Sequence, residues 1–352
     1  MMKDKYEVRF FRVGENSKGG DAIVIRLFDD EDNQHIIVVD GGYSKNGEQI
    51  VRFLVDECHT NTIDIMINTH PDIDHISGLI TILDSDEVSV KKVIMNRPWK
   101  DANLNCSYFR DGRITDNSLD RRIAENFKKA KELEEKAEVD GVELVHPVAG
   151  NSYFDSLTIL GPTMQHYREF LLKSDKTPDA GNAFSTFQRK VAKVVQYIKG
   201  NFIEWFDDEQ TSPINETSIV SVLEIGQQKM LFTGDVGKVG LEAALDKLEE
   251  IEGNTAFCFT KVQLPHHGSR KNINPSILKR IGAADFYISC PPNGLEDGHP
   301  SRRLINKIYQ LFPRARVFIT SGSWLSFYHN VKIKGVPAQC QDVYDEMDGK
   351  VE

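Results

Sequence analysis

The stretch His70-x-Asp72-x-Asp74-His75 constrains this chain more than any other feature of it. It places two imidazoles and two carboxylates within six positions, directly after the apolar run 63–67, which has the pattern of a buried strand. These side chains are typical ligands of divalent metals. Pro71 keeps His70 out of helical backbone, so side chains 70, 72 and 74 can surround one point while Asp74 and His75 reach a second. The pattern indicates two neighbouring metal ions.

The alternative is a polar turn between a strand and a helix, with Asp74 as the N-cap of that helix. Four ligand-type residues at this spacing favour the metal site over the turn.

Further candidate ligands follow two later strand patterns. Run 229–233 ends in Gly234-Asp235, and run 258–264 ends in Pro265-His266-His267-Gly268-Ser269. Asp235 alone would be an ordinary turn residue, and a His-His pair alone would be incidental. After successive strands they reinforce the first cluster, with Asp235 placed to bridge two ions.

The remaining pattern predicts a mixed α/β chain. Antiparallel strands are predicted over 6–13, 22–28 and 35–39, and the pattern after position 218 predicts strands that alternate with helices. One long polar helix is predicted over 118–138, its Lys-rich face being either a polyanion track or an ordinary solvated surface. Two helical patterns lie between Thr163 and Pro213, the second over 184–205.

Several motifs, in this order, resemble those of the metallo-β-lactamase fold superfamily. They are Asp40-Gly41-Gly42, Thr69-His70-x-Asp72-x-Asp74-His75-x-x-Gly78, Phe232-Thr233-Gly234-Asp235 and Pro265-His266-His267-Gly268-Ser269. The sequence is similar, more closely, to the ComEC-type β-lactamase-like domain, on the added evidence of Asn215 to Val220 and Gly298-His299-Pro300. The resemblance covers about residues 5 to 325, with 163–213 as a helical insertion in a single hydrolase domain over 1–352.

The resemblance implies an αββα sandwich with two metal ions at the edge between its sheets. His70 and Asp72 would hold one ion, Asp74 and His75 the other, with Asp235 bridging and at least one of the pair His266 and His267 completing the shell.

Two departures from the wider family pattern bear on the metal. The family usually has His where Asp72 stands, and a further His ligand where this chain has Asn215. Both departures recur in the ComEC-type branch, and they make Mn²⁺ as plausible as Zn²⁺.

The resemblance also implies a mechanism, because paired ions activate a shared water for in-line attack. Asp74 is a candidate to orient that water, and His299 to protonate the leaving group, although it could equally be an ordinary loop histidine. Asp40 is expected to support a ligand histidine, and Asn215 to lie behind the ligands.

Charge suggests the substrate class. The chain has a net charge of −10, which repels polyanions as a whole, so a nucleic-acid site has to be local. Cations follow both predicted site loops: Arg270, Lys271, Arg302 and Arg303. They favour a phosphodiester substrate, and a nuclease is the leading hypothesis.

Other readings stay open. The same ions would support hydrolysis of a small ester, lactone or thioester, and a catalytically weak interaction or sensor module would present the insertion to a protein partner or a second copy. Five scattered cysteines without a C-x-x-C pair, and no apolar membrane or signal segment, lead us to expect a cytoplasmic protein with no membrane partner.

Overall fold

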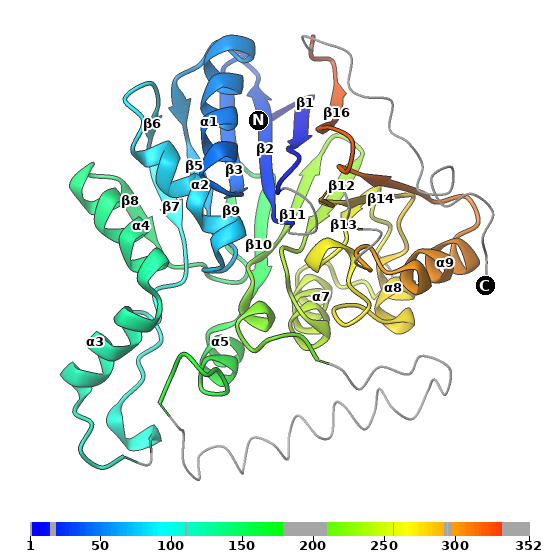
Figure 1. Cartoon of the computed structure of the whole chain (residues 1–352). Helices are drawn as coiled ribbons and strands as arrows, with labels where there is room; N and C mark the ends of the chain where they lie inside the picture. Colours follow the sequence, from blue (N-terminus) through cyan, green and yellow to red (C-terminus); the bar gives the residue numbers. More distant parts are fainter. Residues whose placement is uncertain are drawn as a thin grey trace.

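Two mixed β-sheets lie face to face in the computed structural model, and helices cover their outer faces (Figure 1). The structure describes residues 2–14, 19–109, 111–178, 210–255, 257–291, 294 and 298–332. The chain thus has the α/β metallo-β-lactamase sandwich that the resemblance implied, with αββα layers.

The first sheet is built mainly from the first half of the chain, in the order β16-β1-β2-β3-β5-β7-β8. The predicted opening strands pair antiparallel, and β3, β5, β7 and β8 continue the sheet in parallel. The elements of this half are β1 (Met2–Phe10), β2 (Ala22–Asp29), β3 (Gln34–Gly41), α1 (Ser44–Arg52), β4 (Thr62–Ile63), β5 (Ile65–Ile67), α2 (Ile73–Leu83), β6 (Ser89–Val90), β7 (Lys92–Ile94), α3 (Asp116–Asn126), α4 (Lys128–Val139) and β8 (Glu143–Val145).

The second sheet has the order β15-β14-β13-β12-β11-β10-β9. Its strands β12 to β15 run in parallel, while β9 to β12 form antiparallel pairs. The elements are β9 (Ser152–Tyr153), β10 (Leu157–Gly161), α5 (Met164–Leu171), β11 (Val220–Ile225), β12 (Gln228–Phe232), α7 (Lys238–Glu252), β13 (Lys261–Gln263), α8 (Pro275–Ile281), β14 (Asp285–Ile288), α9 (Arg302–Leu311), β15 (Arg316–Ile319) and β16 (Leu325–His329), which crosses to pair with β1.

Three apolar layers hold the sandwich together. One lies between the sheets and includes Phe10 and Phe232, whose rings stack. The other two lie under the outer helices, beneath α1 to α4 on the first sheet and beneath α7 to α9 on the second. The strands are apolar on both sides because both faces of each sheet are covered.

Glycines bring α2 unusually close to the end of β3. A Cβ on Gly78 would lie 1.8 Å from the Gly41 carbonyl oxygen, so a side chain cannot be accommodated there. The Gly78 N–H donates to the Gly42 carbonyl at 2.9 Å. This contact holds the start of α2, which carries Asp74 and His75, against the strand end that carries Asp40.

One local expectation needs correction. The single helix predicted over 118–138 is two helices, α3 and α4, because Phe127 leaves helical backbone (φ −110°, ψ 40°) as its ring enters the core. β16 was not predicted at all. Within the insertion, α5 fits the first helical pattern, whereas the helix predicted over 184–205 lies outside the described residues.

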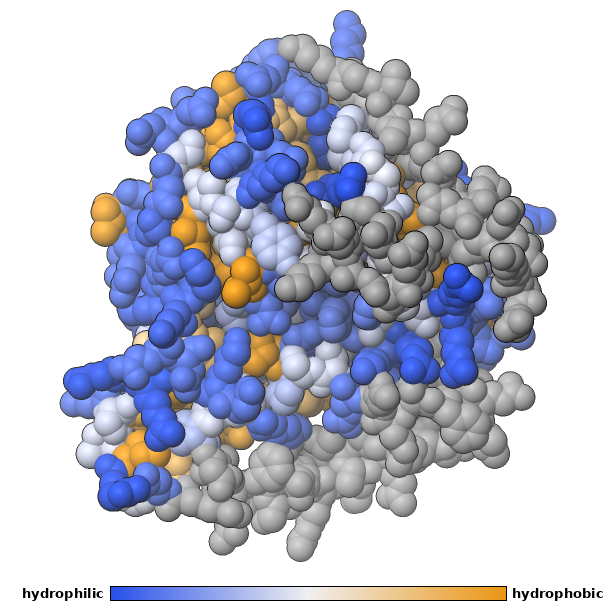
Figure 2. All heavy atoms as spheres, in the orientation of Figure 1, coloured by the Kyte–Doolittle hydropathy of each residue, from blue (hydrophilic) through white to orange (hydrophobic). Residues whose placement is uncertain are grey.

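Among the residues coloured by hydropathy in Figure 2, most of those at the surface are hydrophilic. None of the helices that the structure describes is both long enough and apolar enough to cross a membrane.

Candidate metal centre

The ligand-type side chains meet at one edge of the sandwich. The loops after β3, β5, β12 and β13 supply them, and β3 and β5 run parallel to each other, as do β12 and β13. Carboxyl ends of parallel strands meet at the same edge of a sheet. The sandwich then brings the edges of its two sheets together, which places Asp235 against His70 and His75.

The Asp235 carboxylate is at the centre of the cluster. Its Oδ2 lies 3.8 Å from Nε2 of His70, 3.6 Å from Nε2 of His75 and 3.7 Å from Nε2 of His266. Asp235 is only 3% exposed, and its Oδ1 has no hydrogen-bond partner within the described chain. One carboxylate facing three imidazoles is the arrangement expected of a group that bridges two ions.

Each of the four site histidines is held through Nδ1, which turns Nε2 to the centre. The partners of the four Nδ1 atoms are Thr69 Oγ1 for His70 (3.0 Å), Asp40 Oδ2 for His75 (2.8 Å), Asn272 Oδ1 for His266 (3.2 Å) and the Ser289 carbonyl for His267 (3.0 Å). Such bonds fix the ring tautomer and orientation in metal sites. The buried Nε2 atoms of His70 and His75 have no hydrogen-bond partner among the described residues. A cation would satisfy them, so this donor set fits a dinuclear metal site.

Asp40 supports the cluster from behind. Its fully buried carboxylate accepts hydrogen bonds from the Thr69 N–H (2.8 Å), the Thr69 hydroxyl (2.5 Å) and His75 Nδ1 (2.8 Å). These bonds connect the Asp40 carboxylate to Thr69 and His75, so it can support the loop that carries the candidate ligands.

The carboxylates of Asp72 and Asp74 face the imidazoles. Asp72 Oδ2 lies 3.7 Å from His70 Nε2, and Asp74 Oδ2 lies 3.9 Å from His75 Nε2. Helix α2 begins at Ile73, so Asp74 and His75 lie in its first turn. The N-cap is Asp72, not Asp74, and its side chain makes no capping hydrogen bond.

Both His266 and His267 reach the cluster. From the sequence, at least one of the two was expected there. They form a 3₁₀ turn with Gly268, and both have positive φ (49° and 56°), which is strained backbone for residues other than glycine. The turn directs both rings inward. His267 groups with Asp74 and His75 on one side and with Asp235 on the other, their ligand atoms within 4.8 Å of one another.

Sequence reasoning missed Asp21. This carboxylate is 2% exposed, accepts a hydrogen bond from Gln263 Nε2 at 2.8 Å, and groups with Asp235 and His267. In the sequence it is marked only by its place after Gly19-Gly20, ahead of the second strand. A Cβ on Gly20 would lie 2.1 Å from the Asp74 carbonyl oxygen, so the glycine is needed for Asp21 to pass against α2.

Asn272 was also missed. It is fully buried, and besides holding His266 it donates to the Asp235 carbonyl at 2.8 Å, which ties two ligand loops together. An asparagine in a loop has no distinctive sequence pattern, so only its contacts show that it holds two ligand loops together.

Burial and mutual charge set the ionisation of the cluster. Burial alone would raise the pKa of Asp235, but His266, His75 and His267 hold that pKa well below its usual value. Burial opposes charge on His75, yet Asp235 and Asp40 raise its pKa well above normal. Burial raises the pKa of Asp21 to about 7. Negative and positive groups packed this closely are typical of a functional site.

The other predicted residues lie around the cluster. The ring of His299 stacks beside that of His266 at 5.9 Å between centroids, and Asn215 Nδ2 lies 3.4 Å from His266 Nδ1. Ser301 N–H donates to the Gly268 carbonyl at 3.0 Å, which joins the loop of His299 to that of His266. The four cations are carried by these loops and the start of α9: Arg270, half-buried, and Lys271, Arg302 and Arg303, exposed. Their role in binding substrate stays a prediction.

The first part of the chain matches a known family model. Residues 18–152 match the model of the metallo-beta-lactamase superfamily. No curated protein matches the chain.

Among solved structures, the chain is similar to CmlA, a diiron beta-hydroxylase from Streptomyces venezuelae (11% identity, TM-score 0.45, 93% of this chain and 54% of that one). It is also similar to Igni18, a metallo hydrolase from the archaeon Ignicoccus hospitalis (11% identity, TM-score 0.41, 92% of this chain and 100% of that one). A third is a long-form RNase Z from yeast (12% identity, TM-score 0.37, 81% of this chain and 37% of that one). The chain spans about half the length of the CmlA structure, 54%.

Proposed function

We propose that this protein is a metal-dependent hydrolase whose two divalent ions activate water to cleave phosphodiester bonds, with nucleic acid as the substrate. The observation that carries the proposal is the bridging position of Asp235, whose Oδ2 lies 3.6 to 3.8 Å from three imidazole Nε2 atoms. Buried Nε2 atoms without partners support a metal site there.

The candidate ligands form two groups that would share Asp235. His70 and Asp72 would hold the first ion, and Asp74, His75 and His267 the second, with Asp21 beside His267 and with His266 also facing Asp235. When bound, paired ions lower the pKa of a water molecule and absorb charge that develops on a phosphoryl oxygen. The four carboxylates support hard ions such as Mn²⁺ as well as Zn²⁺.

The protein's own groups have distinct tasks in this scheme. Asp74, at the start of α2, would orient the attacking water as well as hold an ion. His299, whose ring stacks beside that of His266, would give a proton to the leaving oxygen. Asp40, Thr69 and Asn272 hold the imidazoles in place. The imidazoles are therefore already oriented towards the positions that the two ions would occupy.

The basic residues at the loops favour a phosphodiester over a neutral ester. Replacing Arg270 and Arg302 together with Ala is expected to lower cleavage of an oligonucleotide by roughly tenfold or more, because cations bind phosphates of the strand. Hydrolysis of a small neutral ester or lactone is expected to stay within about twofold, since such a substrate has no phosphate for these cations to bind.

The measurement compares kcat/KM on single- and double-stranded DNA and RNA, a small ester and a lactone, with added Zn²⁺ or Mn²⁺. The matched control removes two exposed cations of α3, Arg121 and Arg122. Equal losses on the ester and the oligonucleotide would count against a nuclease and favour an ester or lactone hydrolase.

Asp21 is expected to strengthen the second metal site. The change Asp21→Asn removes a buried negative charge from beside Asp235 and His267, so one of two bound ions is expected to bind about 10- to 100-fold more weakly. Competition with a chelating dye, together with metal analysis after dialysis, measures the two affinities. The control is Asp64→Asn, a buried carboxylate bonded to the Ile36 N–H and Lys91. Two ions bound with unchanged affinity would exclude this role.

A further inference from the structure

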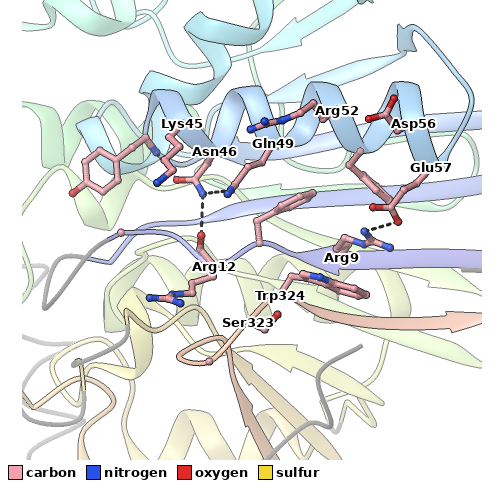
Figure 3. Close-up of a pocket in the computed structure, with 15 residues that line it drawn as sticks. Arg9, Arg12, Lys45, Asn46, Gln49, Arg52, Asp56, Glu57, Ser323 and Trp324 are labelled. Carbon is pink, nitrogen blue, oxygen red and sulfur yellow. Dashed lines mark hydrogen bonds and ion pairs between the residues drawn. The ribbon is translucent and has the colours of Figure 1, made fainter. Parts of the chain in front are cut away.

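A groove beside the metal cluster has the lining of a binding site. Its volume is about 780 Å³, within the range of ligand sites in proteins. As Figure 3 shows, side chains of α1 lie along one side and Arg12, Ser323 and Trp324 along the other. The groove therefore lies between the first outer helix and the turn that leads into β16.

One inner part of the groove is built around Arg9. The Arg9 side chain lies between the rings of Phe53 and Trp324, at 3.9 and 4.0 Å from their centroids, and bonds to Glu7 and Glu57. Arg9 is 2% exposed, so its guanidinium binds protein carboxylates and is not accessible to a ligand in the groove. Trp324 is fixed on this base and remains partly open to the groove.

Three exposed cations lie along the groove: Arg12, Lys45 and Arg52. Asn46 Nδ2 donates to the Arg12 carbonyl and to Gln49 Oε1, both at 2.9 Å, which ties the segment of Arg12 to α1 (Figure 3). From Lys45 to Arg52 the helix rises about 10 Å. The cations thus line a track rather than surround one point.

Tyr43 connects this track to the metal cluster. It follows Asp40-Gly41-Gly42 directly and lines the groove. The N–H of Gly42, next to Tyr43 in the chain, donates to the Asp21 carbonyl at 2.7 Å. The Tyr43 end of the groove therefore adjoins the segment that carries Asp21 into the cluster.

Charge gives the groove a direction. Cations occupy the part from Tyr43 to Arg52, whereas Asp56 and Glu57 line the part beyond them. A polyanion is attracted by the first part and repelled by the second. A strand lying in the groove would accordingly run past Tyr43 towards the metal ions.

We infer that the groove binds a single-stranded segment of nucleic acid next to the bond that is cut. Phosphates pair with Arg12, Lys45 and Arg52, and bases stack on the rings of Tyr43 and Trp324, the combination that sequence-tolerant single-strand sites use. This inference rests on the proposed function. It specifies the substrate as a nucleic acid with a free single-stranded segment.

Charge reversal tests the track. The variant Arg12→Glu/Lys45→Glu/Arg52→Glu is compared with Arg121→Glu/Arg122→Glu/Lys128→Glu, which makes the same charge change on exposed cations of α3 and α4. Binding of a short fluorescein-labelled oligothymidine with hydrolysis-resistant phosphorothioate linkages is measured by anisotropy on the full-length, metal-loaded protein over a range of salt concentrations. The groove variant is expected to bind about tenfold or more weakly than the control, and its slope of log K against log salt to fall by about 2, since each single-strand phosphate contact contributes ~0.7.

Two further measurements separate the possible failures. Bound oligonucleotide should quench tryptophan fluorescence less in Trp324→Phe, which keeps an aromatic ring against Arg9, than in the unmodified protein. Equal affinity and salt slope in the two charge-reversal variants would overturn the groove. Hydrolysis of bis(p-nitrophenyl) phosphate, too small to need the groove, tests the proposed function by itself: it should persist in the groove variant, and its absence from the unmodified protein would overturn the proposed function.

Discussion

Replacing Asp235 with Asn is expected to lower phosphodiester hydrolysis by about 10³-fold or more and to leave at most one tightly bound metal ion per chain. The reason is the shared position of the carboxylate, because a single oxygen faces Nε2 of His70, His75 and His266. An amide carries no negative charge to offset two adjacent cations. The loss should therefore affect both ions and not one of them.

Metal analysis and kcat on a small phosphodiester measure the two effects separately. The control is Asp285→Asn. Asp285 lies at the start of β14 in the same sheet, and its buried carboxylate pairs with Arg316. Its metal content and activity are expected to match those of the unmodified protein. If Asp235→Asn held two ions with ordinary affinity, the bridging role would be wrong.

Replacing Asp40 with Ala is expected to lower the free energy of unfolding by about 3 to 5 kcal/mol, even without metal. The carboxylate is 0% exposed and satisfies two donors of Thr69 and one of His75. Its removal leaves these donors buried without an acceptor, and Thr69 no longer holds His70. Both metal affinity and stability should fall as a result.

Urea denaturation of the metal-free protein tests the stability effect. Asp32→Ala is the control, because Asp32 is exposed and its ion pairs with Lys3 and Lys5 lie at the surface, where a much smaller change is expected. An Asp40→Ala protein that unfolds at the same urea concentration as the unmodified protein would contradict this account.

The fold was largely predictable from local patterns. Runs rich in β-branched and aromatic residues located the three opening strands, and the Asp40-Gly41-Gly42 motif lies where β3 meets α2. The break at Phe127 was not predictable, because the apolar stripe of 118–138 fits one helix as well as two. Burial of that ring in the core decides between them. β16 was missed because its pairing partner, β1, lies at the other end of the chain.

The candidate site divides in the same way. The sequence by itself determined which loops carry ligand-type side chains, since imidazoles and carboxylates that follow apolar strands stand out in the chain, from His70 to His267. Only the tertiary structure decided that both members of the His266 and His267 pair face Asp235 or Asp74, that Asp21 joins them, and that Arg12 and Arg52 share a groove. These relations join segments far apart in the chain. Local propensity carries no information about such distances, which packing of the two sheets sets.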